Sequence, residues 1–219
     1  MNKAVLFDLD GTLLNTIDDL WQSTNYALRR HGYPERSREE VLSFVGNGVA
    51  KLIERATPSA CSQEQVEHTL YTFKTHYLRH SMDRTRPYDG IIPLLTALRR
   101  QQWRIGVVSN KLHEAVEQLC AHYFPHLINV CAGMSVQHRA KPAPDMVLAA
   151  LQQLSVDSSS AVYVGDSDVD IATARAAGLP CVSVSWGFRA RAFLLNNGAE
   201  VVVDTPEQLQ ERLSQMLSV

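Results

Sequence analysis

From residue 91 onward the sequence alternates between helical and strand-like segments, and this rhythm constrains the fold more than any other feature. The expected helices lie near 91–100, 112–123, 145–154, 168–177 and 189–196, and the expected strands at 104–108, 129–133, 161–164, 181–184 and 200–203. A last helix begins at Thr205-Pro206, where proline occupies its first turn. Strands that alternate with helices predict a parallel sheet covered by helices on both faces. The fold class expected is therefore α/β.

A helical segment without strands, from residue 16 to about 80, separates the first apolar strand from this alternating region. Three patterns typical of capping boxes open its helices, at Thr16–Asp19, Ser37–Glu40 and Ser62–Gln65. The segment leaves the core near the carboxyl end of the first strand, where open α/β sheets bind ligands. We therefore expect a core domain of residues 1–14 and 87–219, and a helical domain of residues 15–86 that acts as a lid.

The first strand ends in two carboxylates. Residues two apart in a strand project to the same face, so Asp8 and Asp10 are expected to point together while Leu9 enters the core. Gly11 allows the chain to turn away without a side chain in its path. Two such charges repel by roughly 4 kcal/mol at about 4 Å and an effective dielectric constant near 20. The pair therefore needs a cation nearby or serves in chemistry.

Other polar residues follow strands at the same predicted edge. Ser109 and Asn110 precede a helix, whose N-terminal N–H groups can bind phosphate, although either residue could equally cap that helix. Lys141 precedes a helix start fixed by prolines. Asp166 ends a strand at a glycine, and Asp170 follows one helical turn later. Carboxylates without accompanying histidine or cysteine ligands fit Mg²⁺ better than zinc.

Composition excludes several classes of function. The net charge of −2 provides no basic patch for nucleic acid, and no apolar run of about 20 residues could cross a membrane. The four scattered cysteines suit free thiols in a reducing cytosol better than a disulfide framework. We expect a soluble, cytoplasmic protein that acts on a small molecule and contacts neither nucleic acid nor membrane. The sequence leaves the choice between monomer and homodimer open.

The polar segments, in this order, resemble the haloacid dehalogenase (HAD) superfamily of phosphohydrolases. The matching residues are Asp8-Leu9-Asp10-Gly11-Thr12, Ser109-Asn110, Lys141-Pro142 and Gly165-Asp166-Ser167 with Asp170. The resemblance covers essentially the whole chain and implies a Rossmann-like core with an inserted C1-type helical cap. Within the superfamily the chain is most similar to phosphoglycolate phosphatases, although Asn15 stands where many relatives have Asp.

This resemblance implies roles for the residues named above. Asp8 would attack phosphorus and form an aspartyl-phosphate, and Asp10 would act first as general acid and then as general base. Lys141 would neutralise charge at Asp8 and the phosphate. The remaining assignments are phosphate binding by Thr12, Ser109 and Asn110, and Mg²⁺ binding by Asp8, the Asp10 backbone carbonyl, Asp166 and Asp170. The expected activity is Mg²⁺-dependent hydrolysis of a small phosphate monoester, with phosphoglycolate as the leading substrate.

Two alternative functions remain. A phosphosugar mutase would share the nucleophile and the acid/base residue, and a catalytically inactive binding protein could keep the same fold. A dehalogenase is disfavoured because it would not need the second acid at Asp10.

Several further residues carry weaker expectations. Gly46-Asn47-Gly48 matches the position of the cap loop that reads substrate in relatives, with Lys51 as a helper, but a plain turn between helices fits equally well. His113 and His138 are expected to have no catalytic role. The segment 186–189 either borders the site or serves in packing.

Overall fold

The structure, a computed structural model, describes residues 3–135 and 138–217. Its contacts divide the chain into two compact units. One unit consists of Met1–Leu14 and Pro87–Val219, and the other of Asn15–Arg86. The chain passes between the units at Leu14–Asn15 (β2) and Arg86–Pro87 (β3), which pair as a two-stranded sheet.

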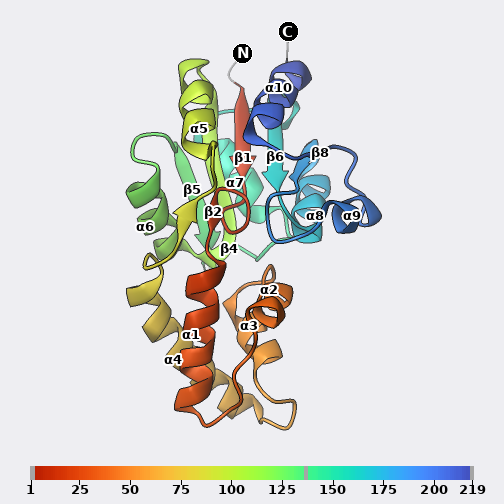
Figure 1. The fold of residues 1–219 in the computed structure, drawn as a ribbon. Helices are drawn as coiled ribbons and strands as arrows, with labels where there is room; N and C mark the ends of the chain where they lie inside the picture. The colour runs from red at the N-terminus through yellow and green to blue at the C-terminus, as the bar shows by residue number, and fades with distance from the viewer. Residues whose placement is uncertain (1–2, 136–137, 218–219) are drawn as a thin grey trace. The chain divides into compact units, whose positions relative to one another are not determined.

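The first unit contains a six-stranded sheet with the order β5-β4-β1-β6-β7-β8, and its neighbouring strands are parallel (Figure 1). The strands are β1 (Ala4–Phe7), β4 (Arg104–Leu112), β5 (Val130–Met134), β6 (Ala161–Gly165), β7 (Cys181–Val184) and β8 (Val202–Val203). In register, Phe7 lies between Val107 and Val164, and all three are fully buried. Such continuous apolar strands are typical of a sheet covered on both faces.

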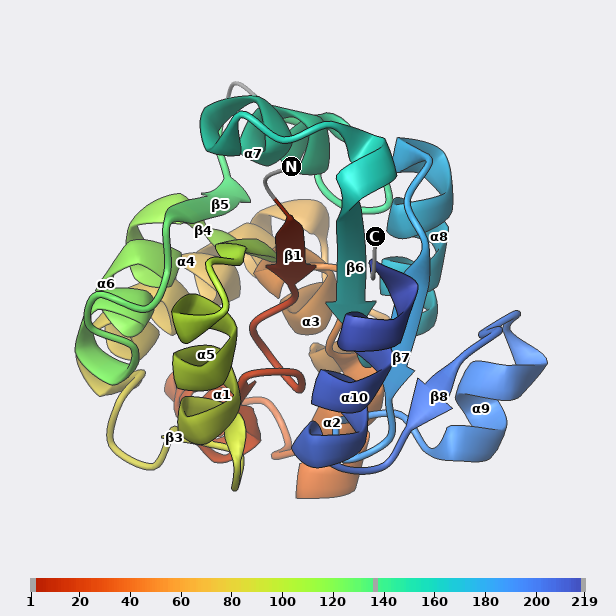
Figure 2. The ribbon, with the colours of Figure 1, turned by 90° about the horizontal axis from the view of Figure 1, so that it is seen from above.

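Helices cover both faces of this sheet. Figure 2 shows α7 and α8 on one face and α5 and α10 on the other. The helices of this unit are α5 (Ile91–Arg100), α6 (His113–Tyr123), α7 (Asp145–Leu154), α8 (Asp168–Ala177), α9 (Arg191–Asn196) and α10 (Pro206–Met216), with a short 3₁₀ turn at Ser158–Ser160. The predicted α/β class and the parallel sheet are confirmed.

Two segments differ from the sequence-based expectation. The last strand, expected over 200–203, is limited to Val202–Val203 at the edge of the sheet, where a single neighbouring strand supports it. The strand β4 continues through the Ser-Asn motif to Leu112, with an irregular register between Val108 and Leu112. The helix α6 therefore starts at His113, and neither Ser109 nor Asn110 caps it.

The second unit is all-helical, as predicted. Its helices are α1 (Ile17–Arg30), α2 (Arg38–Phe44), α3 (Val49–Ala56) and α4 (Gln63–His80). The capping boxes predicted at Ser37–Glu40 and Ser62–Gln65 are present, each with reciprocal hydrogen bonds. The apolar stripes of the helices meet inside the unit, where Leu28, Val41, Ile53 and Phe73 are fully buried.

The capping box predicted at Thr16–Asp19 is wrong. Thr16 makes no side-chain cap hydrogen bond. The Asp19 carboxylate instead accepts hydrogen bonds from the backbone N–H groups of Arg84 and Thr85, at 3.0 and 2.9 Å, and from the Thr85 hydroxyl at 2.8 Å. Because a buried carboxylate needs several donors, partners far along the chain prevailed over the local motif. Asp19 thereby ties the last residues of this unit to α1.

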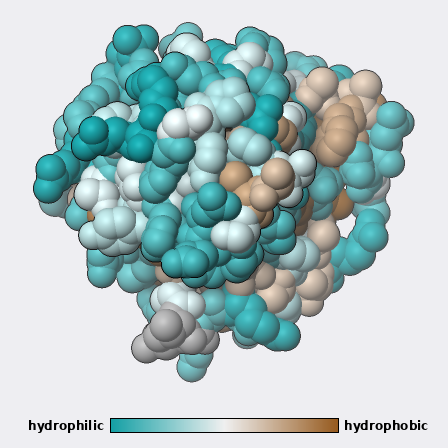
Figure 3. All heavy atoms as spheres, turned by 90° about the horizontal axis from the view of Figure 1, so that it is seen from below, coloured by the Kyte–Doolittle hydropathy of each residue, from teal (hydrophilic) through white to brown (hydrophobic). Residues whose placement is uncertain are grey.

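Within residues 3–135 and 138–217, no helix combines the length and the apolar character that a membrane crossing requires. On the face drawn in Figure 3, hydrophilic residues dominate and hydrophobic ones are interspersed among them.

Candidate active site

The carboxyl ends of β1, β4 and β6 meet at one edge of the sheet, because the three strands are parallel neighbours. Asp8 follows β1 directly, and its N–H donates to the Val164 carbonyl of β6 at 2.8 Å. Asp166 follows β6, and Ser109 lies near the end of β4. Leu9 is fully buried, as predicted, so the chain turns its polar residues to this edge.

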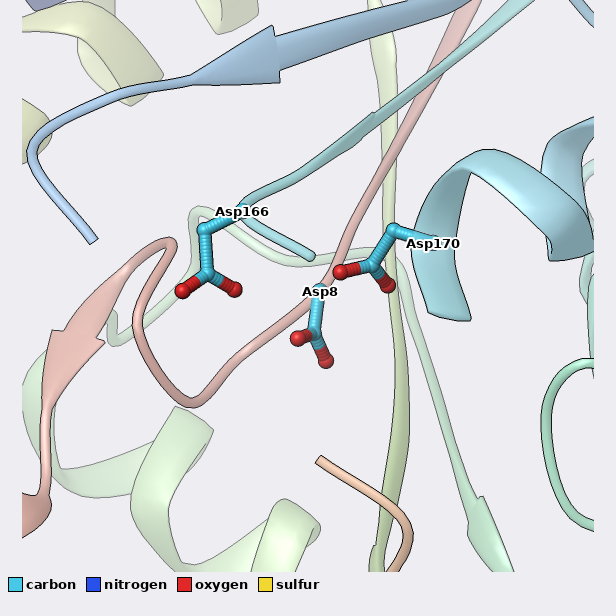
Figure 4. Close-up of side chains that lie close together, drawn as sticks. All are labelled: Asp8, Asp166 and Asp170. Carbon is cyan, nitrogen blue, oxygen red and sulfur yellow. The ribbon is translucent and has the colours of Figure 1, made fainter. Parts of the chain in front are cut away.

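Three carboxylates converge at this edge. Asp8, Asp166 and Asp170 each offer an oxygen, and these oxygens lie within 4.8 Å of one another (Figure 4). All three residues are buried, at 7, 2 and 0% exposure. Asp170 comes from the first turn of α8. The sequence-predicted convergence of acids from separate segments is therefore present in the structure.

Burial and the charges of neighbouring acids make Asp8 and Asp166 hold protons more tightly. Burial is the largest cause that raises the pKa of Asp8 to about 7, and Asp170 adds to it, whereas Lys141 works in the opposite direction. Burial, followed by the charges of Asp170 and Asp8, raises the pKa of Asp166 well above its usual value. A nearby cation would therefore favour the ionised forms of Asp8 and Asp166.

Lys141 provides one positive charge inside this cluster. Its Nζ lies 2.8 Å from Asp8 Oδ1, 2.7 Å from Asp170 Oδ1 and 3.2 Å from the Tyr163 hydroxyl. An ammonium group has three protons to donate, and these three acceptors match that number. Burial disfavours the charged form, but Asp170 and Asp8 outweigh it and raise the pKa of Lys141 well above its usual value.

Asn110 fixes the backbone of Lys141. The Asn110 Oδ1 accepts from the Lys141 N–H at 2.7 Å, and the Asn110 Nδ2 donates to the Lys141 carbonyl at 3.1 Å. The Asn110 side chain is thus used to position the lysine. The Ser109 hydroxyl accepts from the Lys111 N–H at 3.2 Å and is buried at the end of β4.

Asp10 has a lysine of its own, which sequence reasoning missed. The Lys111 Nζ lies 3.1 Å from Asp10 Oδ1, and the two side chains are 4% and 16% exposed. Asp8 and Asp10, which were expected to repel each other, therefore each pair with a lysine of their own, Lys141 and Lys111. The Asp10 carboxylate is not part of the described cluster of three acids. The position of Lys111 directly after Ser-Asn at a buried strand end was the available signal.

Asp170 is a centre of hydrogen bonding, and its role as a metal ligand stays a prediction. Its Oδ1 accepts from Lys141 at 2.7 Å and from the Tyr163 hydroxyl at 3.2 Å. Its Oδ2 accepts from the Ser167 N–H at 3.1 Å and from the Ser167 hydroxyl at 2.6 Å, in the capping box of α8. Sequence reasoning missed Tyr163, whose signal was a phenol within an otherwise aliphatic buried strand.

Asp166 is enclosed by a segment that follows β7. The Phe188 N–H donates to Asp166 Oδ2 at 2.6 Å, and the Thr12 hydroxyl lies 3.5 Å from Oδ1. The backbone at Gly187 passes so close to Asp166 that a Cβ there would collide with the carboxylate and with Gly11. The segment 186–189, expected either to border the site or to serve in packing, therefore borders the site. Thr12 also contacts Asp166.

The other predicted candidates have the following local contacts. Gly46-Asn47-Gly48 connects α2 and α3 in the second unit, where Asn47 accepts a hydrogen bond from Arg55 at 2.9 Å. Lys51 pairs with Glu54 at 2.7 Å. His113 Nδ1 accepts from the Gly133 N–H at 3.3 Å, which links α6 to β5. A substrate-reading role for the glycine loop and Lys51 stays a prediction.

The donor set fits a divalent metal ion. Among the described residues, Asp8, Asp166 and Asp170 lie together and Lys141 pairs with two of them, Asp8 and Asp170, so the cluster has an excess of negative charge when ionised. Carboxylate oxygens are the ligands preferred by hard cations such as Mg²⁺ and Ca²⁺. The acidic cluster is therefore suited to a divalent cation.

A sequence profile of the haloacid dehalogenase-like hydrolases matches residues 5–184. The chain therefore belongs to this family of hydrolases. The N-acetylmuramic acid 6-phosphate phosphatase of Pseudomonas aeruginosa is 33% identical over 98% of this chain and 96% of that protein. A plasmid-encoded phosphoglycolate phosphatase of Cupriavidus necator is 34% identical over 96% of this chain and 93% of that protein.

A solved structure agrees with these sequence relatives. The crystal structure of a candidate phosphoglycolate phosphatase from Lactobacillus delbrueckii subsp. bulgaricus superposes with a TM-score of 0.93 and 36% identity, covering 97% of this chain and 99% of that one. The predicted family, the fold and the enzyme class, a hydrolase of phosphoric monoesters, are confirmed.

Proposed function

We propose that the protein hydrolyses a small phosphate monoester with the help of Mg²⁺, and that Asp8 is the nucleophile. The observation that carries this proposal is the Asp8 carboxylate, which is buried, lies 2.8 Å from the Lys141 ammonium and belongs to the cluster of three acids. The relatives named as phosphoglycolate phosphatases make phosphoglycolate the first substrate to test.

The reaction has two steps. In the first, an Asp8 oxygen bonds to phosphorus while the bond from phosphorus to the alcohol oxygen breaks, and Asp10 donates a proton to that departing oxygen. In the second, water attacks the phosphorus of the aspartyl-phosphate and gives its proton to Asp10. Inorganic phosphate then leaves, and Asp8 is regenerated as a carboxylate.

The neighbouring residues balance the negative charge of Asp8 and of the phosphate during both steps. Lys141 balances the charge of Asp8 and of the phosphate oxygens, and its position is fixed by Asn110 and Tyr163. The Ser109 hydroxyl and nearby N–H groups are the proposed phosphate donors. A magnesium ion held by Asp8, the Asp10 carbonyl and Asp166 would reduce the repulsion between substrate and carboxylates. Asp170 orients Lys141.

A phosphate-release assay over a panel of small monoesters tests this function. The purified protein should release phosphate from phosphoglycolate or a related ester in the presence of Mg²⁺, in a one-to-one ratio with substrate loss. The Asp8→Asn variant provides the blank. Substrate conversion without free phosphate would favour the phosphosugar mutase, and tight binding without any turnover would favour the inactive binding protein.

The Mg²⁺ effect on thermal stability should grow with pH. Asp8 has a folded-state pKa of about 7 against 3.8 for the ordinary group, so its protonation stabilises the fold below about pH 4 and this contribution is lost as the pH rises to 7. Because Mg²⁺ must replace those protons, it should raise Tm by several degrees at pH 8 and scarcely at pH 5.

Differential scanning fluorimetry with and without 10 mM MgCl₂ measures this difference. The Asp166→Asn variant should lose most of the Mg²⁺-induced shift at pH 8. The matched control is Asp157→Asn, an exposed acid before the 3₁₀ turn. An equal Mg²⁺ shift at both pH values would contradict the assignment of the acidic cluster as the metal site.

A further inference from the structure

We propose that Lys111 selects substrates that carry a carboxylate beside the phosphate ester. This inference rests on the proposed function and goes beyond it, because it names a residue that reads the leaving group. Lys111 is a buried cation at the end of β4, with 4% of its side chain exposed, and its Nζ is 3.1 Å from Asp10 Oδ1.

The distance from Lys111 to the leaving oxygen follows from the role of Asp10 as general acid. A general acid must come within hydrogen-bond distance, about 3 Å, of the oxygen that it protonates. The Lys111 ammonium is 3.1 Å from the same carboxylate. It therefore lies within roughly 6–8 Å of the leaving oxygen, given those two hydrogen-bond lengths and the width of a carboxylate. A carboxylate one carbon away from that oxygen can reach it.

The charges at the site make such a cation necessary for an acidic leaving group. Lys141 already pairs with both Asp8 and Asp170. When Asp10 is ionised, a substrate carboxylate placed about 4 Å from it would be repelled by roughly 4 kcal/mol at an effective dielectric constant near 20. Lys111 offsets that repulsion, and an ammonium on a flexible stem can turn from Asp10 toward a second carboxylate without losing a charged partner.

The substrate named for one relative agrees with this chemistry. Phosphoglycolate, for which the Cupriavidus necator relative is named, carries its carboxylate one carbon away from the ester oxygen.

A comparison of two substrates in two variants tests the proposal. The substrates are 2-phosphoglycolate and 2-hydroxyethyl phosphate, in which a neutral hydroxymethyl group replaces the carboxylate. Because Lys111 also pairs with Asp10, Lys111→Met should slow both reactions, but it should lower kcat/KM for phosphoglycolate about 100-fold more than for hydroxyethyl phosphate, since only phosphoglycolate loses the partner of its carboxylate. Lys111→Arg should recover part of the preference, and Lys74→Met on α4 is the matched control.

Two outcomes would overturn the proposal. An equal loss for both substrates would mean that Lys111 acts only through Asp10, and an unchanged preference would mean that it does not read the carboxylate. Calorimetric binding in the Asp8→Asn background repeats the comparison without turnover. The wild-type protein could bind phosphoglycolate more tightly than hydroxyethyl phosphate through Lys111 and yet hydrolyse neither substrate. That result would refute the proposed function but would preserve this inference.

Discussion

Replacement of Asp8 by Asn should lower kcat at least about 10⁴-fold, the scale seen when a covalent nucleophile is removed. The amide oxygen of asparagine is a poor nucleophile and cannot leave as a carboxylate in the second step. Turnover is measured as phosphate release at saturating Mg²⁺ and substrate. Because a group with its pKa raised to about 7 resists burial as an anion, the neutral asparagine should leave Tm without Mg²⁺ unchanged or higher at pH 8.

The control for this variant is Asp157→Asn, which makes the same chemical change at an exposed acid outside the sheet edge. It should keep wild-type activity. A kcat for Asp8→Asn within tenfold of wild type would show that another group attacks phosphorus, and the proposed mechanism would fail with it.

The fold was predictable because strands that are buried on both faces are apolar at nearly every position, and this pattern is visible in the sequence. The strand that contains Val162 and Val164 is apolar at nearly every position, and such a run has few alternatives once helices flank it. The convergence of Asp8 and Asp166 followed in turn, since both come directly after neighbouring parallel strands. The sequence around a residue was enough to predict its place in the fold when that place depended only on the strand that it belongs to or follows.

The remaining contacts depend on partners that are distant in sequence. Asp19 pairs with Thr85, 66 residues away, so its local capping motif was misleading. Asp166 is held by the backbone of Phe188, which leaves no side-chain pattern in the sequence. Tyr163 lay within a predicted strand and Lys111 beyond the predicted end of another. Only the folded sheet brings them to Lys141 and Asp10.

Gly187, whose backbone approaches Asp166, is a further residue whose role depends on a distant partner. Gly187 has no local turn signature that distinguishes it from other glycines. In the folded protein, its backbone fills the space beside Asp166 where any Cβ would collide. A close approach of this kind depends on two segments at once and cannot be inferred from either.

Replacement of Lys141 by Met should cause the largest loss of stability among variants of the site. It leaves Asp170, which is fully buried, without its ammonium partner, and breaking a buried ion pair costs about 3–5 kcal/mol. The loss should be greater at pH 8 than at pH 5, because Asp8, whose pKa burial raises to about 7, takes up a proton at the lower pH. Urea denaturation without Mg²⁺ at both pH values measures it. Activity should fall about 10²- to 10³-fold, as for the loss of one electrostatic stabiliser of the transition state.

The double variant Lys141→Met/Asp170→Asn separates this charge effect from lost packing. Removing the second charge should restore part of the free energy of unfolding at pH 8, so the two substitutions should be non-additive by more than about 1 kcal/mol. Additive losses, or a stability difference that does not depend on pH, would show that Lys141 stabilises the fold by packing alone. The ammonium of Lys141 would then not be what allows three carboxylates to share the edge of this sheet.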